Sequence, residues 1–262
     1  MKRETYKQFK ERVVHPADDL FAILFLNFIT VRLAYIIIRF KINITPNAVT
    51  YLRMFLISPL IIILLIVAPI FSNSKIFYLA ALILSYCFLL SDWLDGQIAR
   101  GLNKTSRKGM ILDSIADRFS TIILLVLFFS IGMYYRSLVI LLLSVFLFAL
   151  KCFHMMVITK LYYYEVGNKS NAKEIFNGAD AMGKLGVASI FRKLSSLIKI
   201  KRWGGTLGGS DKFFITVMLP IVLVLFGFYY ETILLLLAFE VFLLIFFVIR
   251  IKNLFREMDL VH

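Results

Sequence analysis

The sequence predicts an all-α fold, a six-transmembrane-helix bundle preceded by an N-terminal amphipathic helix at the membrane interface. Of the 262 residues, 60% are hydrophobic and the mean hydropathy is +0.85. This composition excludes a disordered chain and does not suit an ordinary soluble enzyme. Six apolar runs reach the roughly 20 residues that cross a bilayer. The 30 Lys and Arg, against 16 Asp and Glu, gather in alternate connections between these runs.

The apolar runs define the domain organisation. We expect a membrane domain at 48–251, a cytosolic N-terminal region with the interfacial helix at 1–47, and a cytosolic tail at 252–262. The connection at 163–212 is long and basic. The six expected spans are 48–71, 76–98, 110–133, 137–162, 213–229 and 232–251.

The basic residues predict the orientation of the bundle. The first connection contains one basic residue, Lys75, and the third contains one, Arg136. The fifth contains no Lys or Arg. The N-terminus, the second and fourth connections and the C-terminal tail carry most of the others. Because Lys and Arg remain on the cytoplasmic side, we expect a multi-pass protein of the cell membrane with both termini cytosolic.

Two further segments are apolar on one face. Residues 20–40 are long enough to span, but a span there would place the basic N-terminus outside, so an interfacial helix is favoured and a seventh span is the alternative. Residues 184–203, inside the long connection, alternate apolar and basic positions at helical spacing. They predict an amphipathic helix lying on anionic headgroups.

Four carboxylates at the cytosolic ends of spans two and three indicate chemistry. Asp92 and Asp95 are three residues apart, and Asp113 and Asp117 are four apart, so each pair lies on one helix face. A short turn between antiparallel helices would bring the two faces together. Such carboxylates coexist ionised only around cations, and all-oxygen ligands suit Mg²⁺, Mn²⁺ or Ca²⁺. The cluster could hold two metal ions, as in displacement reactions at phosphorus.

These residues belong to a longer pattern, which resembles the signature of the CDP-alcohol phosphotransferase (CDP-alcohol phosphatidyltransferase) family. The signature is Asp-x2-Asp-Gly-x2-Ala-Arg-x8-Gly-x3-Asp-x3-Asp. All eight of its fixed positions are matched, by Asp92, Asp95, Gly96, Ala99, Arg100, Gly109, Asp113 and Asp117.

The resemblance implies a membrane enzyme, a transferase of substituted phosphate groups. Its donor would be CDP-linked, of the CDP-diacylglycerol type, and its products a phosphodiester and CMP. Mg²⁺ or Mn²⁺, as two ions, would be held by Asp92, Asp95, Asp113 and Asp117, and Asp117 would also be the catalytic base. The segment that leads into span one, residues 45–50, is also similar to the family. The nucleotide would therefore lie against Gly96, Ala99, Arg100, Gly109, Asn47 and Thr50.

The acceptor alcohol is less clearly indicated. Arg53, Arg118 and Lys151 are cations near the aspartates, and they suggest an acceptor that itself carries phosphate, such as inositol phosphate. Pairing with the aspartates or snorkelling to the surface is the alternative for them. Glycerol phosphate, serine and other sugar alcohols stay open as acceptors.

The expected partners are the donor, a small acceptor alcohol, membrane lipids and a second copy in a homodimer, but no nucleic acid. A divalent-cation or lipid transporter is the alternative class of function. Transporters commonly have internal repeats and sites at the bilayer midplane. This sequence has no visible repeat, and its carboxylates cluster toward one side.

Overall fold

The computed structural model describes residues 5–14, 21–71, 73–136, 138–139, 141–143, 145–146, 149, 212–228 and 231–238. Within these ranges the chain is helical, with no strand, so the expected all-α class is confirmed there. The elements in order are α1 (Tyr6–Val13), η1 (Ala22–Leu26), α2 (Asn27–Arg39), α3 (Pro46–Leu52), η2 (Arg53–Ile57), α4 (Ser58–Val67), α5 (Ser74–Gly101), α6 (Arg107–Tyr135), η3 (Phe214–Met218) and α12 (Leu219–Leu225), where η marks a π-helical turn.

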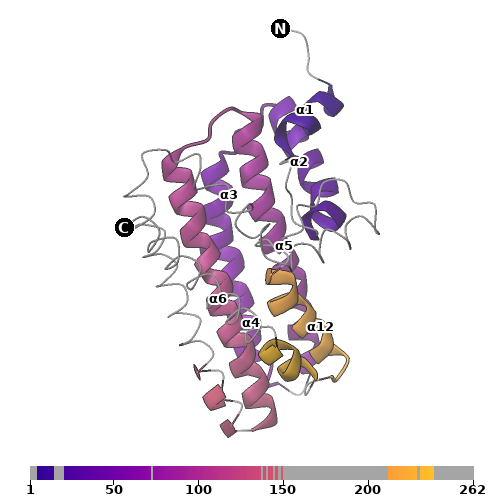
Figure 1. The fold of residues 1–262 in the computed structure, drawn as a ribbon, viewed down its shortest axis with the longest axis vertical. Coiled ribbons are helices and arrows are strands. Elements are labelled where there is room, and N and C mark those ends of the chain that lie inside the picture. Colours follow the sequence, from indigo (N-terminus) through magenta and orange to yellow (C-terminus); the bar gives the residue numbers. More distant parts are fainter. Residues whose placement is uncertain are drawn as a thin grey trace, which may run out of the picture.

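Three long helical rods form the centre of the structure (Figure 1). The first is the continuous run α3–η2–α4, and α5 and α6 lie beside it. α5 and α6 are antiparallel and are joined by a short connection at one end of the bundle, which we call the motif end. The first rod also begins near the motif end, where Thr45 caps α3 by accepting a 3.2 Å hydrogen bond from the Ala48 amide, and Pro46 occupies the first turn.

Four described helices are long and apolar enough to cross a membrane, judged by length and composition. They are Ala22–Arg39, Pro46–Val67, Ser74–Gly101 and Lys108–Tyr135. The last three coincide with the first three spans expected from the sequence, and they are confirmed as helices of spanning length. The described part of span five is the shorter apolar helix Phe214–Leu225. Of span six only 231–238 are described, and they are helical; most of span four and the helix expected at 184–203 lie outside the described residues.

The N-terminal region packs against α5. α2 lies along the half of α5 nearest the motif end (Figure 1). The buried side chains of Asn27 and Gln97 join the two helices by a 3.1 Å hydrogen bond. Ala22–Arg39 thus forms the helix expected within residues 20–40, and it also has the length and hydropathy of a span. Its interfacial position stays a prediction.

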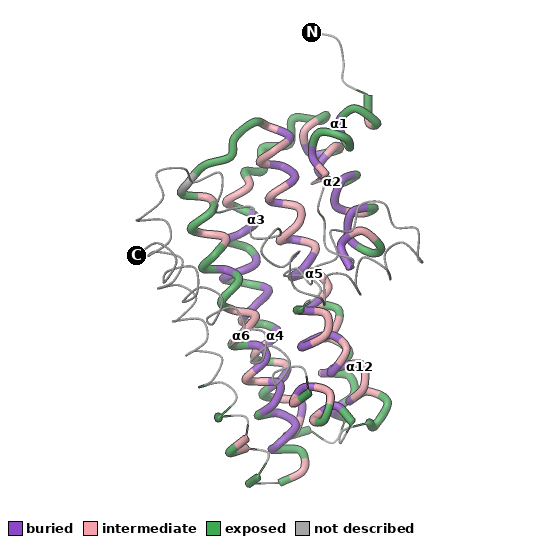
Figure 2. The backbone as a smooth tube through the Cα atoms, in the orientation of Figure 1, coloured by how far each residue is buried: buried purple, intermediate pink, exposed green. Residues whose placement is uncertain are grey.

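Apolar side chains occupy both the inside and the outside of the bundle. Buried side chains line the faces where α4, α5 and α6 meet, among them Ile61, Phe88 and Leu127 (Figure 2). Large apolar side chains also face outward, with Phe55 70% and Ile83 57% exposed. Soluble proteins rarely expose so much apolar surface, so the outer faces are suited to lipid.

Candidate active site

The turn between α5 and α6 brings the two halves of the motif together. α5 ends because Asn103 adopts a left-handed conformation (φ 54°) and the Lys104 amide donates a 2.8 Å hydrogen bond back to the Ala99 carbonyl. α6 then begins at Arg107, and the preceding Ser106 caps it by accepting a 3.0 Å hydrogen bond from the Gly109 amide. The chain therefore reverses within a few residues, as the sequence predicts for two antiparallel helices.

Three of the four predicted aspartates converge across this turn. Carboxylate oxygens of Asp92, Asp113 and Asp117 all lie within 4.8 Å of one another. The side chain of Asp92 is 27% exposed, that of Asp113 46%, and that of Asp117 60%. Three oxygens at this spacing are a donor set that a hard divalent cation could bridge.

Arg53 lies among these carboxylates. Its guanidinium donates hydrogen bonds to Asp92 and, at 2.5 Å, to Asp113, and it is 3.7 Å from a carboxylate oxygen of Asp117. The arginine side chain is fully buried. The sequence left two readings of Arg53 open, and the pairing with aspartates is the one observed here. Its expected contact with the acceptor stays a prediction.

Asp95 makes a separate contact. Its carboxylate accepts a 2.7 Å hydrogen bond from the hydroxyl of Thr50, and both side chains are buried. Thr50, expected beside the nucleotide, therefore orients one of the expected metal ligands. Asn47, one turn earlier on α3, lies near Gly109, because a Cβ atom built on that glycine would lie 3.5 Å from the Asn47 side-chain oxygen. A Cβ at 109 would be closer still, at 3.2 Å, to the hydroxyl of Ser106, so the glycine leaves room for this cap of α6.

Arg100 contacts its own helix and the N-terminal segment. Its guanidinium lies against Gly96, where an added Cβ would meet Nη1 at 3.2 Å. Its Nε donates a 2.7 Å hydrogen bond to the Val13 carbonyl. In return Arg12 donates to the carbonyls of Arg100 and Gly101, at 3.2 and 3.0 Å, at the end of α5. α1 therefore stabilises the C-terminus of α5, where a positively charged side chain is favourable.

The sequence analysis missed this role of α1. A signal was available, because Thr5 and Gln8 form a capping box, a pattern that marks the start of a helix.

Three expected site residues remain to be located. Ala99 is half-buried on α5, Arg118 is exposed on α6 beside Asp117, and Lys151 lies outside the described residues.

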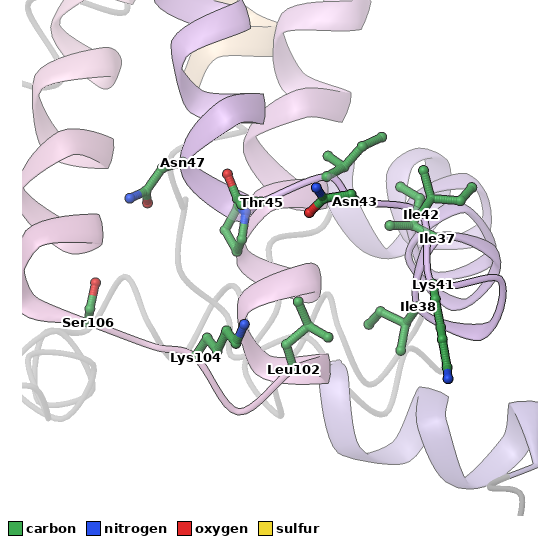
Figure 3. A pocket seen from close by; sticks show the side chains of 12 residues that line it. Ile37, Ile38, Lys41, Ile42, Asn43, Thr45, Asn47, Leu102, Lys104 and Ser106 are labelled. Carbon is green, nitrogen blue, oxygen red and sulfur yellow. The ribbon is translucent and has the colours of Figure 1, made fainter.

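A pocket of about 490 Å³ opens at the motif end. α2 and the segment that follows it line one side, and the starts of α3 and α6 line the other (Figure 3). Asn47 and Ser106 lie on that second side, while Lys104 lies below them on the connection from α5 to α6. Thr45 and Leu102 also line the pocket. It offers polar groups and apolar walls beside the motif.

Comparison with known proteins identifies the family. A sequence model described as CDP-alcohol phosphatidyltransferase matches residues 43–254, most of the chain. The chain belongs to the CDP-alcohol phosphatidyltransferase family. The family consists of multi-pass membrane transferases of phosphate-containing groups that serve phospholipid biosynthesis, and it is generally dependent on divalent metal ions. The acidic cluster at Asp92, Asp113 and Asp117 falls inside the matched region.

One curated relative adds sequence similarity but no activity. It is described as an "Uncharacterized protein" of Aquifex aeolicus (strain VF5) and is 34% identical over 101 residues. The aligned part is 37% of this chain and 43% of the relative, so the chain spans less than half of that protein's length. No solved structure matches the chain.

Proposed function

We propose that this chain is a membrane CDP-alcohol phosphotransferase that moves a substituted phosphate group from a CDP-linked lipid to an acceptor alcohol. The observation that carries the proposal is the convergence of Asp92, Asp113 and Asp117 within 4.8 Å at the family motif. The donor would be of the CDP-diacylglycerol type, since the helices around the site have apolar outer faces suited to lipid tails.

The donor set fits hard divalent cations. Asp92, Asp113 and Asp117 supply carboxylate oxygens, and Asp95, fixed by Thr50, would add a fourth carboxylate. Mg²⁺ or Mn²⁺, as two ions, would be held by these four residues. When bound, the ions would neutralise the diphosphate of the donor and stabilise CMP as the leaving group.

Asp117 is proposed as the catalytic base. Its side chain is 60% exposed, the most open of the three clustered carboxylates, so an acceptor hydroxyl can reach it. The carboxylate takes the proton as the hydroxyl oxygen forms a bond to the phosphorus that carries the lipid. The bond from that phosphorus to the oxygen of CMP breaks, and CMP leaves with the electron pair.

The nucleotide is proposed to lie at the motif end. The pocket of about 490 Å³ beside Asn47 and Ser106 is large enough for part of a nucleotide. Gly109 has no side chain, so the backbone at the start of α6 would stay open to the nucleotide. Gly96 directly follows Asp95 on α5, Ala99 and Arg100 lie about one turn further along, and the three would complete this side of the site.

The acceptor is proposed to be a polyol phosphate such as inositol phosphate. Arg118 is exposed next to Asp117 and could contact a phosphate on the acceptor, together with Arg53 and Lys151. Glycerol phosphate, serine and other sugar alcohols are the competing acceptors. We further propose that the site and both termini face the cytosol in the cell membrane, following the basic residues of the loops, and that the protein is a homodimer.

The proposal is tested by product analysis. Purified protein in detergent is incubated with CDP-diacylglycerol, Mg²⁺ and one alcohol at a time from a panel that includes inositol phosphate, glycerol phosphate and serine. We expect CMP release and one new phospholipid with a single member of the panel. Asp113→Asn is the matched inactive control. Equal rates of CMP release with and without every acceptor would contradict a transferase.

A further inference from the structure

The position of Arg53 is unusual for a charged side chain. It lies in the first predicted span, and the residue has no exposed surface. Its guanidinium contacts Asp92, Asp113 and Asp117, so three carboxylates surround one cation. Burying a charge is unfavourable unless opposite charges accompany it, so the arginine and the carboxylates require one another when no other cation is present.

The backbone around Arg53 is adapted to this position. A π-helical turn, Arg53–Ile57, begins at the arginine and separates α3 from α4. The wider turn alters the backbone hydrogen bonding, and the Ser58 hydroxyl donates a 2.7 Å hydrogen bond to the Arg53 carbonyl. Single π turns inside α-helices occur frequently at functional sites. Here the turn begins at the residue whose side chain contacts the carboxylates.

The guanidinium is also incompletely satisfied. Its Nε is buried and has no hydrogen-bond partner among the described residues. One flat side rests near the ring of Phe88, with the guanidinium carbon 5.4 Å from the ring centroid. Two of its nitrogens donate hydrogen bonds to the carboxylates, and the third nitrogen donates none. The guanidinium therefore makes fewer hydrogen bonds than it could.

We propose that Arg53 is an internal counter-cation that holds the aspartates together without metal and competes with the metal ions for them. This inference rests on the proposed function, because it takes Asp92, Asp113 and Asp117 as metal ligands. Arg53 is then a positioning residue that lowers the affinity for metal. One guanidinium does not neutralise three carboxylates, so the cluster keeps an attraction for a divalent cation.

The test measures metal binding without donor or acceptor. Mn²⁺ affinity is determined by isothermal titration in detergent for the wild type, Arg53→Met and Arg53→Lys. Arg53→Met removes both the competing hydrogen bonds and the positive charge, so we expect Mn²⁺ to bind at least about tenfold more tightly. Arg53→Lys keeps the charge but cannot bridge two carboxylates, so we expect Mn²⁺ to bind more tightly than to wild type, though by less than in Arg53→Met.

A control and a second measurement separate this effect from a structural one. Arg32→Met removes the same charge from an exposed position on α2, where the guanidinium lies over Phe28, and should leave Mn²⁺ affinity unchanged. In EDTA, Arg53→Met should unfold several degrees below wild type, and saturating Mn²⁺ should raise its Tm by more than it raises that of wild type.

The outcomes are distinguishable. Wild-type or weaker Mn²⁺ affinity in Arg53→Met would overturn the role of Arg53 and leave the proposed enzyme intact. No Mn²⁺ binding by the wild type would overturn the metal site and this inference together. If Arg53→Met does not fold, Arg53→Lys decides, because an ammonium cannot bridge two carboxylates as a guanidinium does. Its Tm should be lower than wild type in EDTA and equal to it in Mn²⁺, and the same deficit in both would overturn the proposal.

Discussion

The hydrogen bond from Thr50 to Asp95 should control how well the site binds metal. Thr50→Val replaces the hydroxyl by a methyl group of similar size, so the packing of α3 against α5 is kept. The hydroxyl's contacts to Asp95 and, at 3.3 Å, to the Pro46 carbonyl of its own helix are lost. The bond to Asp95 is 2.7 Å long, and both residues are buried, at 3% and 6% exposed. Water therefore cannot readily replace the lost donor.

The size of the effect follows from the nature of the bond. A hydrogen bond to a charged acceptor contributes about 1.5–3 kcal/mol. At about 1.4 kcal/mol per factor of ten, its loss corresponds to about 10- to 150-fold in affinity if Asp95 ligates the metal. Mutating residues that orient metal ligands typically weakens binding by about 10- to 100-fold, which agrees with this estimate.

Isothermal titration with Mn²⁺ measures the effect directly. Thr50→Ser keeps the hydroxyl and should remain within about threefold of wild type. Thr30→Val is the matched control, since the buried Thr30 hydroxyl donates a hydrogen bond to the carbonyl of Leu26, four residues earlier in the chain. Wild-type Mn²⁺ affinity in Thr50→Val would refute the reasoning, and Thr50 would then be left with the contact to the nucleotide expected from the sequence.

Three further predictions concern topology, catalysis and the N-terminal helix. A cysteine at Asn73 should react with an impermeant reagent added outside intact cells, and a cysteine at Lys104 should not; reversed labelling would contradict the orientation. Asp117→Asn should bind donor with metal within about tenfold of wild type while turnover falls by about 10²–10⁴-fold, whereas Asp95→Asn should lose metal-dependent donor binding. Equal loss of donor binding in both would make Asp117 mainly a ligand. Gly101→Leu should detach α1 and speed proteolysis of the N-terminal segment, because a Cβ there would lie 2.9 Å from the ring of Phe9 on α1; unchanged proteolysis would show that α1 does not depend on this contact.

Much of the site could be predicted because its determinants are local in the sequence. The spacing of Asp92, Asp113 and Asp117 fixes their helix faces, and the short connection makes α5 and α6 run antiparallel. Thr45 and Pro46 predict the start of α3, which the structure confirms. These features depend on helix geometry and capping, which act over a few residues.

The contacts that could not be predicted join distant parts of the chain. Nothing in the local pattern indicates that Arg100 bonds to Val13. The carboxylates that pair with Arg53 likewise lie 39 and 60 residues away in the sequence, so no local pattern indicates the pairing. Thr50 was expected at the nucleotide because its sequence neighbours suggested it, while its partner Asp95 lies 45 residues away.

The most direct test of the proposed function is metal-dependent release of CMP by the purified protein. CDP-diacylglycerol and the acceptor identified from the panel are supplied, and CMP is measured first in excess EDTA and then after Mg²⁺ or Mn²⁺ is added beyond the chelator. We expect no release in EDTA, recovery with either ion, and no recovery in Asp113→Asn, because the carboxylates alone cannot neutralise a diphosphate. Undiminished CMP release in excess EDTA, or full activity of Asp113→Asn, would contradict a metal-dependent phosphotransferase built on these aspartates.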